Sequence, residues 1–159
     1  MKKKRISLSI YHLCVFSVLL ILSSCSKEYS PNYTKFTITS VKVNSMSFVN
    51  SGSKDWDPGT GPDVFIKIED QYSVLLDGTV SKYQDISDAN LPLIWSLEHE
   101  VSDLSELLYI GVYDYDSFDP DDAIGYVSFK MNEHTGSYPE SFSMWNGSLW
   151  VTISGEWSY

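Results

Sequence analysis

The feature that most constrains the fold is a long succession of short β-type segments separated by turn residues. The segments are rich in Val, Ile, Thr, Tyr, Phe and Trp, and several alternate apolar with polar residues. They comprise residues 35–43, 64–69, 72–76, 79–83, 95–101, 108–112, 125–131, 141–145 and 148–154. Only residues 86–90 and 102–107 are suited to a helical turn. About eight short antiparallel strands with turn chemistry between them predict an all-β fold, either a sandwich or a barrel.

Local signals add detail to this strand pattern. Asp77-Gly78 lies between residues 72–76 and 79–83, and Asn146-Gly147 lies between the last two segments. Both dipeptides predict tight hairpin turns. The alternation of the first segment shifts phase at Ser40-Val41, which predicts a β-bulge.

The first 24 residues have the features of a secretion signal. Lys2 to Arg5 are basic, Ile6 to Leu22 are mostly apolar, and the run ends in Leu22-Ser23-Ser24-Cys25. This ending resembles a bacterial lipobox, which implies cleavage before Cys25 and lipid on that residue. A plain signal peptide and an uncleaved anchor are the alternatives. We therefore expect a signal peptide at 1–24, a lipidated Cys25 with a tether at 25–32, and one domain at 33–159.

Composition excludes several classes of function. All 21 acidic residues but only 7 of the 11 basic residues follow the signal, so residues 25–159 carry a net charge of −14. Such a charge argues against nucleic acid as a partner, because nucleic-acid sites are basic. The two cysteines are Cys14, in the signal, and Cys25. No cysteine remains in the domain for a disulfide, a zinc site or a thiol nucleophile.

An unusual density of aspartates follows the strand at 108–112. Side chains at i and i+2 of a strand point the same way, so Asp114 and Asp116 share one side of the strand end. The turn then leads back to Asp122, at the start of the next strand. A second acidic turn, Trp56 to Asp63, is rich in Gly and Pro and carries an aspartate at position 57. If both turns lie at one end of the fold, five carboxylates converge.

Converging carboxylates repel one another and call for protonation or a bound cation. Many oxygen ligands with loose geometry suit calcium better than magnesium, while the shortage of Cys and His disfavours zinc and copper. An EF-hand does not fit. Starting that loop at Asp114 places Asp119 at its glycine position and Gly125 at its bidentate acid position.

The two motifs together resemble the C2 domain. They are D-x5-D before VFIKI, and D-x-D-x5-D-x-x-G ending at Gly125, with Asn90-Leu91-Pro92 and Trp95 between them. The resemblance implies an eight-stranded antiparallel β-sandwich that ligates calcium. Because one strand precedes the first motif and a full strand follows Trp145, we expect the permuted topology of phospholipase-type C2 domains. The ligands implied by position are Asp57, Asp63, Asp114, Asp116 and Asp122, with Asp119 as a further oxygen donor and backbone carbonyls from Trp56 and Tyr115. A C2-like fold whose acids are merely solvated is the alternative.

The resemblance also bears on lipid contact. Phe118 lies at the tip of the third loop, where some relatives insert an apolar residue into lipid, and packing against a neighbouring loop is the alternative. The lysine-rich strand that binds phosphoinositides in many C2 domains is represented here only by Lys67 and Lys82.

We therefore expect a non-catalytic calcium-binding module, lipid-anchored at the bacterial outer membrane on its periplasmic or surface face. Calcium would order the loops and contact a phospholipid or a protein partner. The alternative is a glycan-binding surface lipoprotein with a structural calcium, which requires an exposed platform of Trp56, Trp145 or Trp150. An enzyme would need a nucleophile and base pattern, and motifs such as H-E-x-x-H or G-x-S-x-G do not occur.

Overall fold

The computed structural model describes residues 31–159 except 58 and 80. The predicted signal peptide and Cys25 lie outside the described residues. Residues Asn32–Tyr159 form one compact unit. Within the described part of the chain, no helix is long and apolar enough to cross a membrane.

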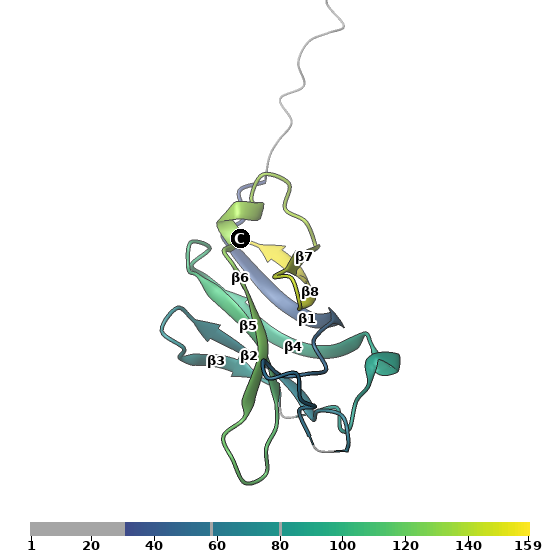
Figure 1. Ribbon diagram of the computed structural model, residues 1–159. Helices are drawn as coiled ribbons and strands as arrows, with labels where there is room; N and C mark the ends of the chain where they lie inside the picture. Colours follow the sequence, from purple (N-terminus) through teal and green to yellow (C-terminus); the bar gives the residue numbers. More distant parts are fainter. Residues whose placement is uncertain (1–30, 58, 80) are drawn as a thin grey trace, which may run out of the picture. The chain divides into compact units, whose positions relative to one another are not determined.

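Eight strands and two short 3-10 helices make up this unit (Figure 1). The strands are β1 (Lys35–Ser45), β2 (Val64–Asp70), β3 (Leu75–Gly78), β4 (Leu93–Val101), β5 (Leu108–Asp114), β6 (Asp122–Phe129), β7 (Ser141–Trp145) and β8 (Trp150–Ser158). The 3-10 helices are η1 (Asp88–Asn90) and η2 (Met131–His134).

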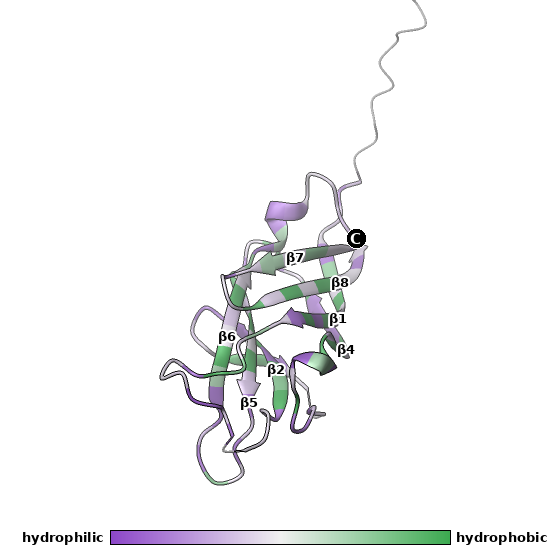
Figure 2. Ribbon diagram, turned by 45° about the vertical axis from the view of Figure 1, so that its right-hand side comes forward, coloured by the Kyte–Doolittle hydropathy of each residue, from purple (hydrophilic) through white to green (hydrophobic). Residues whose placement is uncertain are grey.

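The strands form two four-stranded antiparallel sheets, ordered β4-β1-β8-β7 and β3-β2-β5-β6. Inward residues alternate with outward ones, as in Phe36, Ile38, Val41 and Val43 of β1. Figure 2 shows this alternation as green and pale or purple bands along the strands. The buried residues of both sheets form a single hydrophobic cluster. Residues 32–159 therefore contain both sheets and the whole described core, and the predicted β-sandwich is correct.

The turn predictions had mixed outcomes. The Asn146-Gly147 turn is correct, and Gly147 adopts φ 102° there. The Asp77-Gly78 turn is wrong, because both residues belong to β3 and pair with Ile68 and Lys67. The reversal lies earlier, where Asp70 Oδ1 accepts the N–H groups of Tyr72 and Val74, each at 2.8 Å. An aspartate that caps a turn with its side chain outweighed the dipeptide signal.

The predicted β-bulge and the predicted helical turns can also be compared with the structure. The register of β1 shifts between Ile38 and Ser40, beside the predicted bulge. Of the two possible helical turns, residues 86–90 contain η1, whereas residues 102–107 form no helix. The second 3-10 helix, η2, was not predicted.

The two ends of the sandwich differ in what they carry. β1 ends where β4 begins, at Val43↔Leu93, and β2 begins where β5 ends, at Val64↔Asp114. The two places lie at the same end of the sandwich, because Tyr83 bridges to Val64 and donates its hydroxyl to the Ile94 carbonyl at 2.8 Å. We call this the loop end; it lies at the bottom of Figure 1. At the opposite end, Thr34 N–H donates to the Ser158 carbonyl at 2.9 Å.

Candidate metal centre

Strand register brings two of the predicted acidic positions, Asp114 and Asp122, into one row and places a third, Asp63, next to it. Val64, Asp114 and Asp122 are Cα partners across β2, β5 and β6. Asp63 immediately precedes Val64, and its N–H donates to Asp114 Oδ1 at 2.7 Å. Tyr115 N–H donates back to the Asp63 carbonyl at 2.9 Å. The last residue of β5 is thus fixed against the residue before β2.

Asp114 is the most constrained of these acids. The residue is 2% exposed. Burial raises the pKa of Asp114 to about 6, although the hydrogen bond from the Asp63 N–H opposes this rise. The negative charges of Asp57, Asp116 and Asp63 raise it further. Ionised Asp114 is therefore disfavoured unless a positive charge comes close.

Asp116 joins the remaining acids to this group. Burial again raises its pKa, followed by the charges of Asp122, Asp57, Asp119 and Asp121. All six predicted aspartate ligands therefore lie within one field of mutual repulsion at the loop end. They do not form a closed cage, since no three His, Cys, Asp or Glu side chains of the described residues are close enough together to hold a metal ion.

Lys82 lies among these acids, a placement that the sequence did not predict. Lys82 Nζ is 2.7 Å from Asp63 Oδ2 and 3.6 Å from the centroid of the Tyr115 ring. The side chains of Lys82 and Asp63 are only 27% and 18% exposed. The ammonium thus neutralises one predicted calcium ligand from within the chain.

Asp85 was also missed, and it occupies the other oxygen of the same carboxylate. Its N–H donates to Asp63 Oδ1 at 3.0 Å. Asp85 adopts φ 49°, a conformation that Asp tolerates better than most residues. Lys82 had been placed on a predicted strand at 79–83 and Asp85 just beyond it, so nothing in the pattern indicated that either reaches another loop.

The remaining predicted positions are placed as follows. Asp57 is half-buried, and Asp119 is exposed. Trp56 is half-buried against the core, and its Nε1 donates to the Ser47 carbonyl at 3.0 Å. Ligation by the carbonyls of Trp56 and Tyr115 stays a prediction. Asp121, which is not among the predicted ligands, lies 3.4 Å from Lys67 Nζ through its Oδ2.

Phe118 stands alone at the tip of the β5–β6 loop. Its side chain is 100% exposed. Packing against a neighbouring loop, the alternative to lipid contact, is therefore not what the structure shows.

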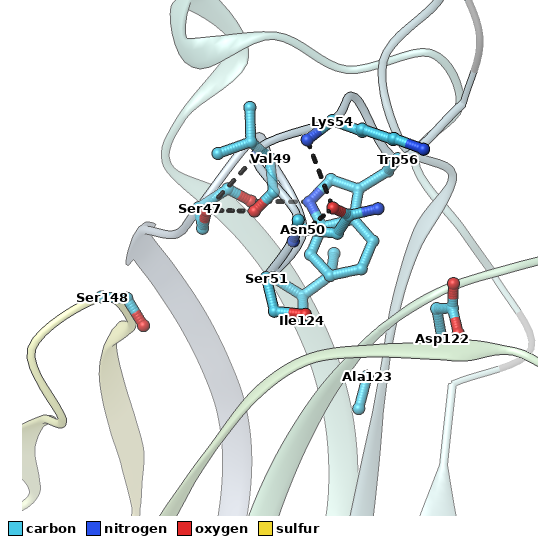
Figure 3. Close-up of a pocket in the computed structure, with 11 residues that line it drawn as sticks. Ser47, Val49, Asn50, Ser51, Lys54, Trp56, Asp122, Ala123, Ile124 and Ser148 are labelled. Carbon is cyan, nitrogen blue, oxygen red and sulfur yellow. Dashed lines mark hydrogen bonds between the residues drawn. The ribbon is translucent and has the colours of Figure 1, made fainter.

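A pocket of about 650 Å³ opens beside the acids (Figure 3). The β1–β2 loop lines it with Ser47, Asn50, Lys54 and Trp56, and β6 contributes Asp122 to Ile124. Ser148 of the β7–β8 turn lies across the pocket from Asp122. Asp122 thus stands between the acidic group and the pocket.

Comparisons with known proteins identify the family and the fold. A sequence model of the C2 domain matches residues 39–145. No curated protein is a significant sequence match. Human GIVD cytosolic phospholipase A2, solved with an inhibitor and terbium chloride, is similar in structure with a TM-score of 0.53 and 14% identity.

That match covers 78% of this chain and 17% of the phospholipase, so the chain spans about a sixth of that relative's length. A C2 domain of a plant extended synaptotagmin 1 matches with a TM-score of 0.46 and 18% identity, over 81% of this chain and 99% of that domain. The likeness to the phospholipase bears out the predicted phospholipase-type topology, in which β1 lies inside its sheet between β4 and β8. With two thirds of its length matched, this chain belongs to the C2 domain family.

Proposed function

We propose that this protein is a lipid-anchored, calcium-binding C2 module of the bacterial cell envelope. C2 domains are generally non-catalytic modules that bind calcium, phospholipid membranes or proteins. The observation that carries the proposal is buried Asp114, surrounded by the charges of Asp57, Asp63 and Asp116. A divalent cation relieves this repulsion more strongly than a single ammonium.

The donor set fits calcium. Asp57, Asp63, Asp114, Asp116 and Asp122 would hold the ion, with Asp119 as a further donor at the loop tip. All are hard oxygen ligands from loops and strand ends, which suits the loose coordination of six to eight oxygens that calcium accepts. The solved human relative was prepared with terbium chloride, and terbium is also a hard, oxygen-seeking cation. Outside the cytoplasm an affinity of about 10⁻⁴–10⁻³ M suffices.

Lipid on Cys25 would anchor the domain at the end opposite these loops. Nine residues lie between Cys25 and Lys35, and the ten Cα–Cα steps reach at most about 35 Å when fully stretched. The ten steps from Lys35 to Ser45 in β1 span about 33 Å. An inverted pose, with the loops on the anchoring membrane, would need a fully stretched tether. The loops therefore reach a second membrane or a protein partner more readily.

Calorimetric titration of residues 32–159 with calcium tests the metal site. We expect saturable binding by the parent and at least tenfold weaker binding by Asp116→Asn. Asp121→Asn is the matched control, since it removes one charge from the same loop at a residue that pairs with Lys67 and is not a predicted ligand. Equal near-zero heats for parent and Asp116→Asn, with no thermal stabilisation of the parent by millimolar calcium, would exclude the site.

Liposome sedimentation tests the lipid contact. We expect calcium-dependent pelleting with phosphatidylserine-containing vesicles, reversed by chelator and weakened by Phe118→Ala. Tyr72→Ala is the control, because Tyr72 is 77% exposed in the β2–β3 turn, away from the loop end. If pelleting is the same with and without chelator, or if Phe118→Ala pellets like Tyr72→Ala and the parent, the partner of the calcium loops is not a phospholipid surface.

Fractionation of cells tests the anchor. The parent chain should enter the outer-membrane fraction, whereas Cys25→Ser should be found in the soluble fraction. Protease added to intact cells then separates the surface face from the periplasmic face. Recovery of Cys25→Ser in the membrane fraction in parental amounts would contradict lipidation at this residue.

A further inference from the structure

Two neighbouring tryptophans are exposed on the outer face of the sheet β4-β1-β8-β7. Trp145 ends β7 and Trp150 begins β8, and the two are Cα partners. They are 72% and 48% exposed. Partners across antiparallel strands point to the same face. A single exposed apolar side chain is common on protein surfaces and needs no explanation. Two adjacent exposed indoles form a patch, and such patches often mark binding sites.

The strand positions next to this pair carry hydroxyl and amide groups. Ser143 and Thr152 lie two residues further from the β7–β8 turn than the tryptophans. They are Cα partners on the same outer face, and their hydroxyl oxygens are 2.7 Å apart. Asn44 of β1 donates from Nδ2 to Thr152 Oγ1 at 2.9 Å. These three residues form a hydrogen-bonded polar patch beside the indoles.

A second polar row crosses the whole sheet. Its members are serines, one from each strand, paired in register, and all lie on the outer face: Ser141, Ser154, Ser40 and Ser96. Lys42 and Ile94 continue the Ser143–Thr152 row across the same face, and Ile94 is 51% exposed. In the described part of the chain, the β7–β8 side of this face therefore carries two indoles beside hydroxyl groups, while Ile94 lies on the edge strand β4. A lipid surface or the apolar centre of a protein interface would find few apolar partners next to the indoles.

A sugar chain combines the two kinds of surface that this face offers. The C–H face of a pyranose ring stacks on an indole, and its hydroxyls exchange hydrogen bonds with Ser, Thr and Asn. Neighbouring strands lie about 5 Å apart, which is similar to the length of one sugar residue, so consecutive rings can lie over Trp145 and Trp150. The net charge of −14 after the signal disfavours an anionic polymer.

We propose that the outer face of this sheet binds a neutral glycan. Trp145 and Trp150 form the stacking platform, and Ser143, Thr152 and Asn44 bond the sugar hydroxyls. The site gives the glycan-binding alternative of the sequence a defined location. It lies on a different sheet from Asp114 and uses none of the predicted calcium ligands, and the turn between the two tryptophans lines the pocket beside Asp122 through Ser148.

Affinity electrophoresis of residues 32–159 tests the proposal directly. Native gels would contain xyloglucan, mixed-linkage β-glucan, galactomannan or soluble starch, with polygalacturonate as the anionic comparison. We expect retardation in at least one neutral polysaccharide, unchanged by chelator. Trp145→Ala and Trp150→Ala should each weaken that retardation about tenfold, in the range for loss of a buried aromatic anchor. Circular dichroism should show both variants folded, because the side chains are exposed.

Phe118→Ala and Tyr72→Ala are matched controls, since each removes an exposed aromatic ring elsewhere and should leave retardation unchanged. Absence of retardation in every neutral polysaccharide would refute the proposal, as would equal retardation of the double Trp variant. If the Trp variants lose vesicle pelleting instead, the platform belongs to a membrane contact. Loss of calcium binding by Asp116→Asn with glycan retardation intact would separate the two sites.

Discussion

Lys82 gives the sharpest prediction, because its ammonium occupies the place where a cation is expected. To bind through Asp63, calcium must displace an ion pair of 2.7 Å whose side chains are 27% and 18% exposed. Exposed ion pairs contribute about 0–1 kcal/mol, and hydrogen bonds between charged groups about 1.5–3 kcal/mol. We therefore take about 1.5 kcal/mol as the free energy that the half-buried pair of Lys82 and Asp63 contributes. Since about 1.4 kcal/mol is a factor of ten in a binding constant, Lys82→Met should raise calcium affinity about tenfold.

The same substitution should have the opposite effect without calcium. Removing the ammonium leaves Asp63 unpaired among like charges, so the free energy of unfolding in chelator should fall by about 1–2 kcal/mol. In saturating calcium this deficit should disappear. Calorimetry measures the affinity, and urea unfolding with and without calcium measures the stability.

Lys67→Met is the matched control for this experiment. Lys67 pairs with Asp121 at 3.4 Å, has 26% exposure, and lies 4.1 Å from the Tyr113 ring centroid. It therefore resembles Lys82 in charge, exposure and aromatic contact, but it touches no predicted ligand. Affinity should change less than about threefold, as for surface charges. If Lys82→Met binds calcium no better than the parent, or if Lys67→Met shows the same gain, Lys82 does not compete with the metal.

Three further outcomes follow from the structure. The pKa of Asp114 is about 6 in the folded protein, against an ordinary value of 3.8. Protonated Asp114 therefore stabilises the fold fully below about pH 4, and this stabilisation is lost as pH rises through about 6. Without metal, the free energy of unfolding should fall by up to about 3 kcal/mol over that window. Asp114→Asn should flatten this pH profile in urea unfolding and abolish calcium binding, and an unchanged profile would contradict the assignment. Gly61→Ala would place a Cβ against the backbone carbonyl of Ile86, so calcium affinity and thermal stability should both drop, whereas Gly136→Ala, which meets nothing within 4 Å, should change neither. Tyr113→Phe should cost about 1 kcal/mol in urea unfolding, because the Tyr113 hydroxyl donates to Glu69 Oε2 at 2.7 Å, and a loss below a few tenths would show that water replaces this bond.

The fold was predictable because its signals are local. Alternation along β1, the Asn146-Gly147 turn and the apolar phase of Leu108, Ile110 and Val112 are each encoded within a few residues. The β2–β3 hairpin was mispredicted for a related reason. Asp70 caps its turn through a side-chain hydrogen bond, and this competes with the Asp77-Gly78 dipeptide, which β3 absorbs instead.

The acidic group was predictable in membership but not in arrangement. Spacing alone predicted that Asp114 and Asp116 lie on one side of a strand end. In the structure, the pKa of each is raised by burial and by the charges of the other predicted ligands. The partner Lys82 was not predictable, because 19 residues separate it from Asp63 and the contact depends on the path of the intervening β2–β3 hairpin. The exposed pair of Trp145 and Trp150 depends likewise on which face of β7 turns outward.

The hydrogen bond between Thr34 and the Ser158 carbonyl brings the two ends of the domain together. Closely spaced termini make a domain easy to append to, or to insert into, another chain. A fluorescent protein joined after Tyr159 would sit beside the tether and leave the β5–β6 loop clear. Such a fusion would let the capture of vesicles be followed by fluorescence, with and without calcium, without altering the loops under study.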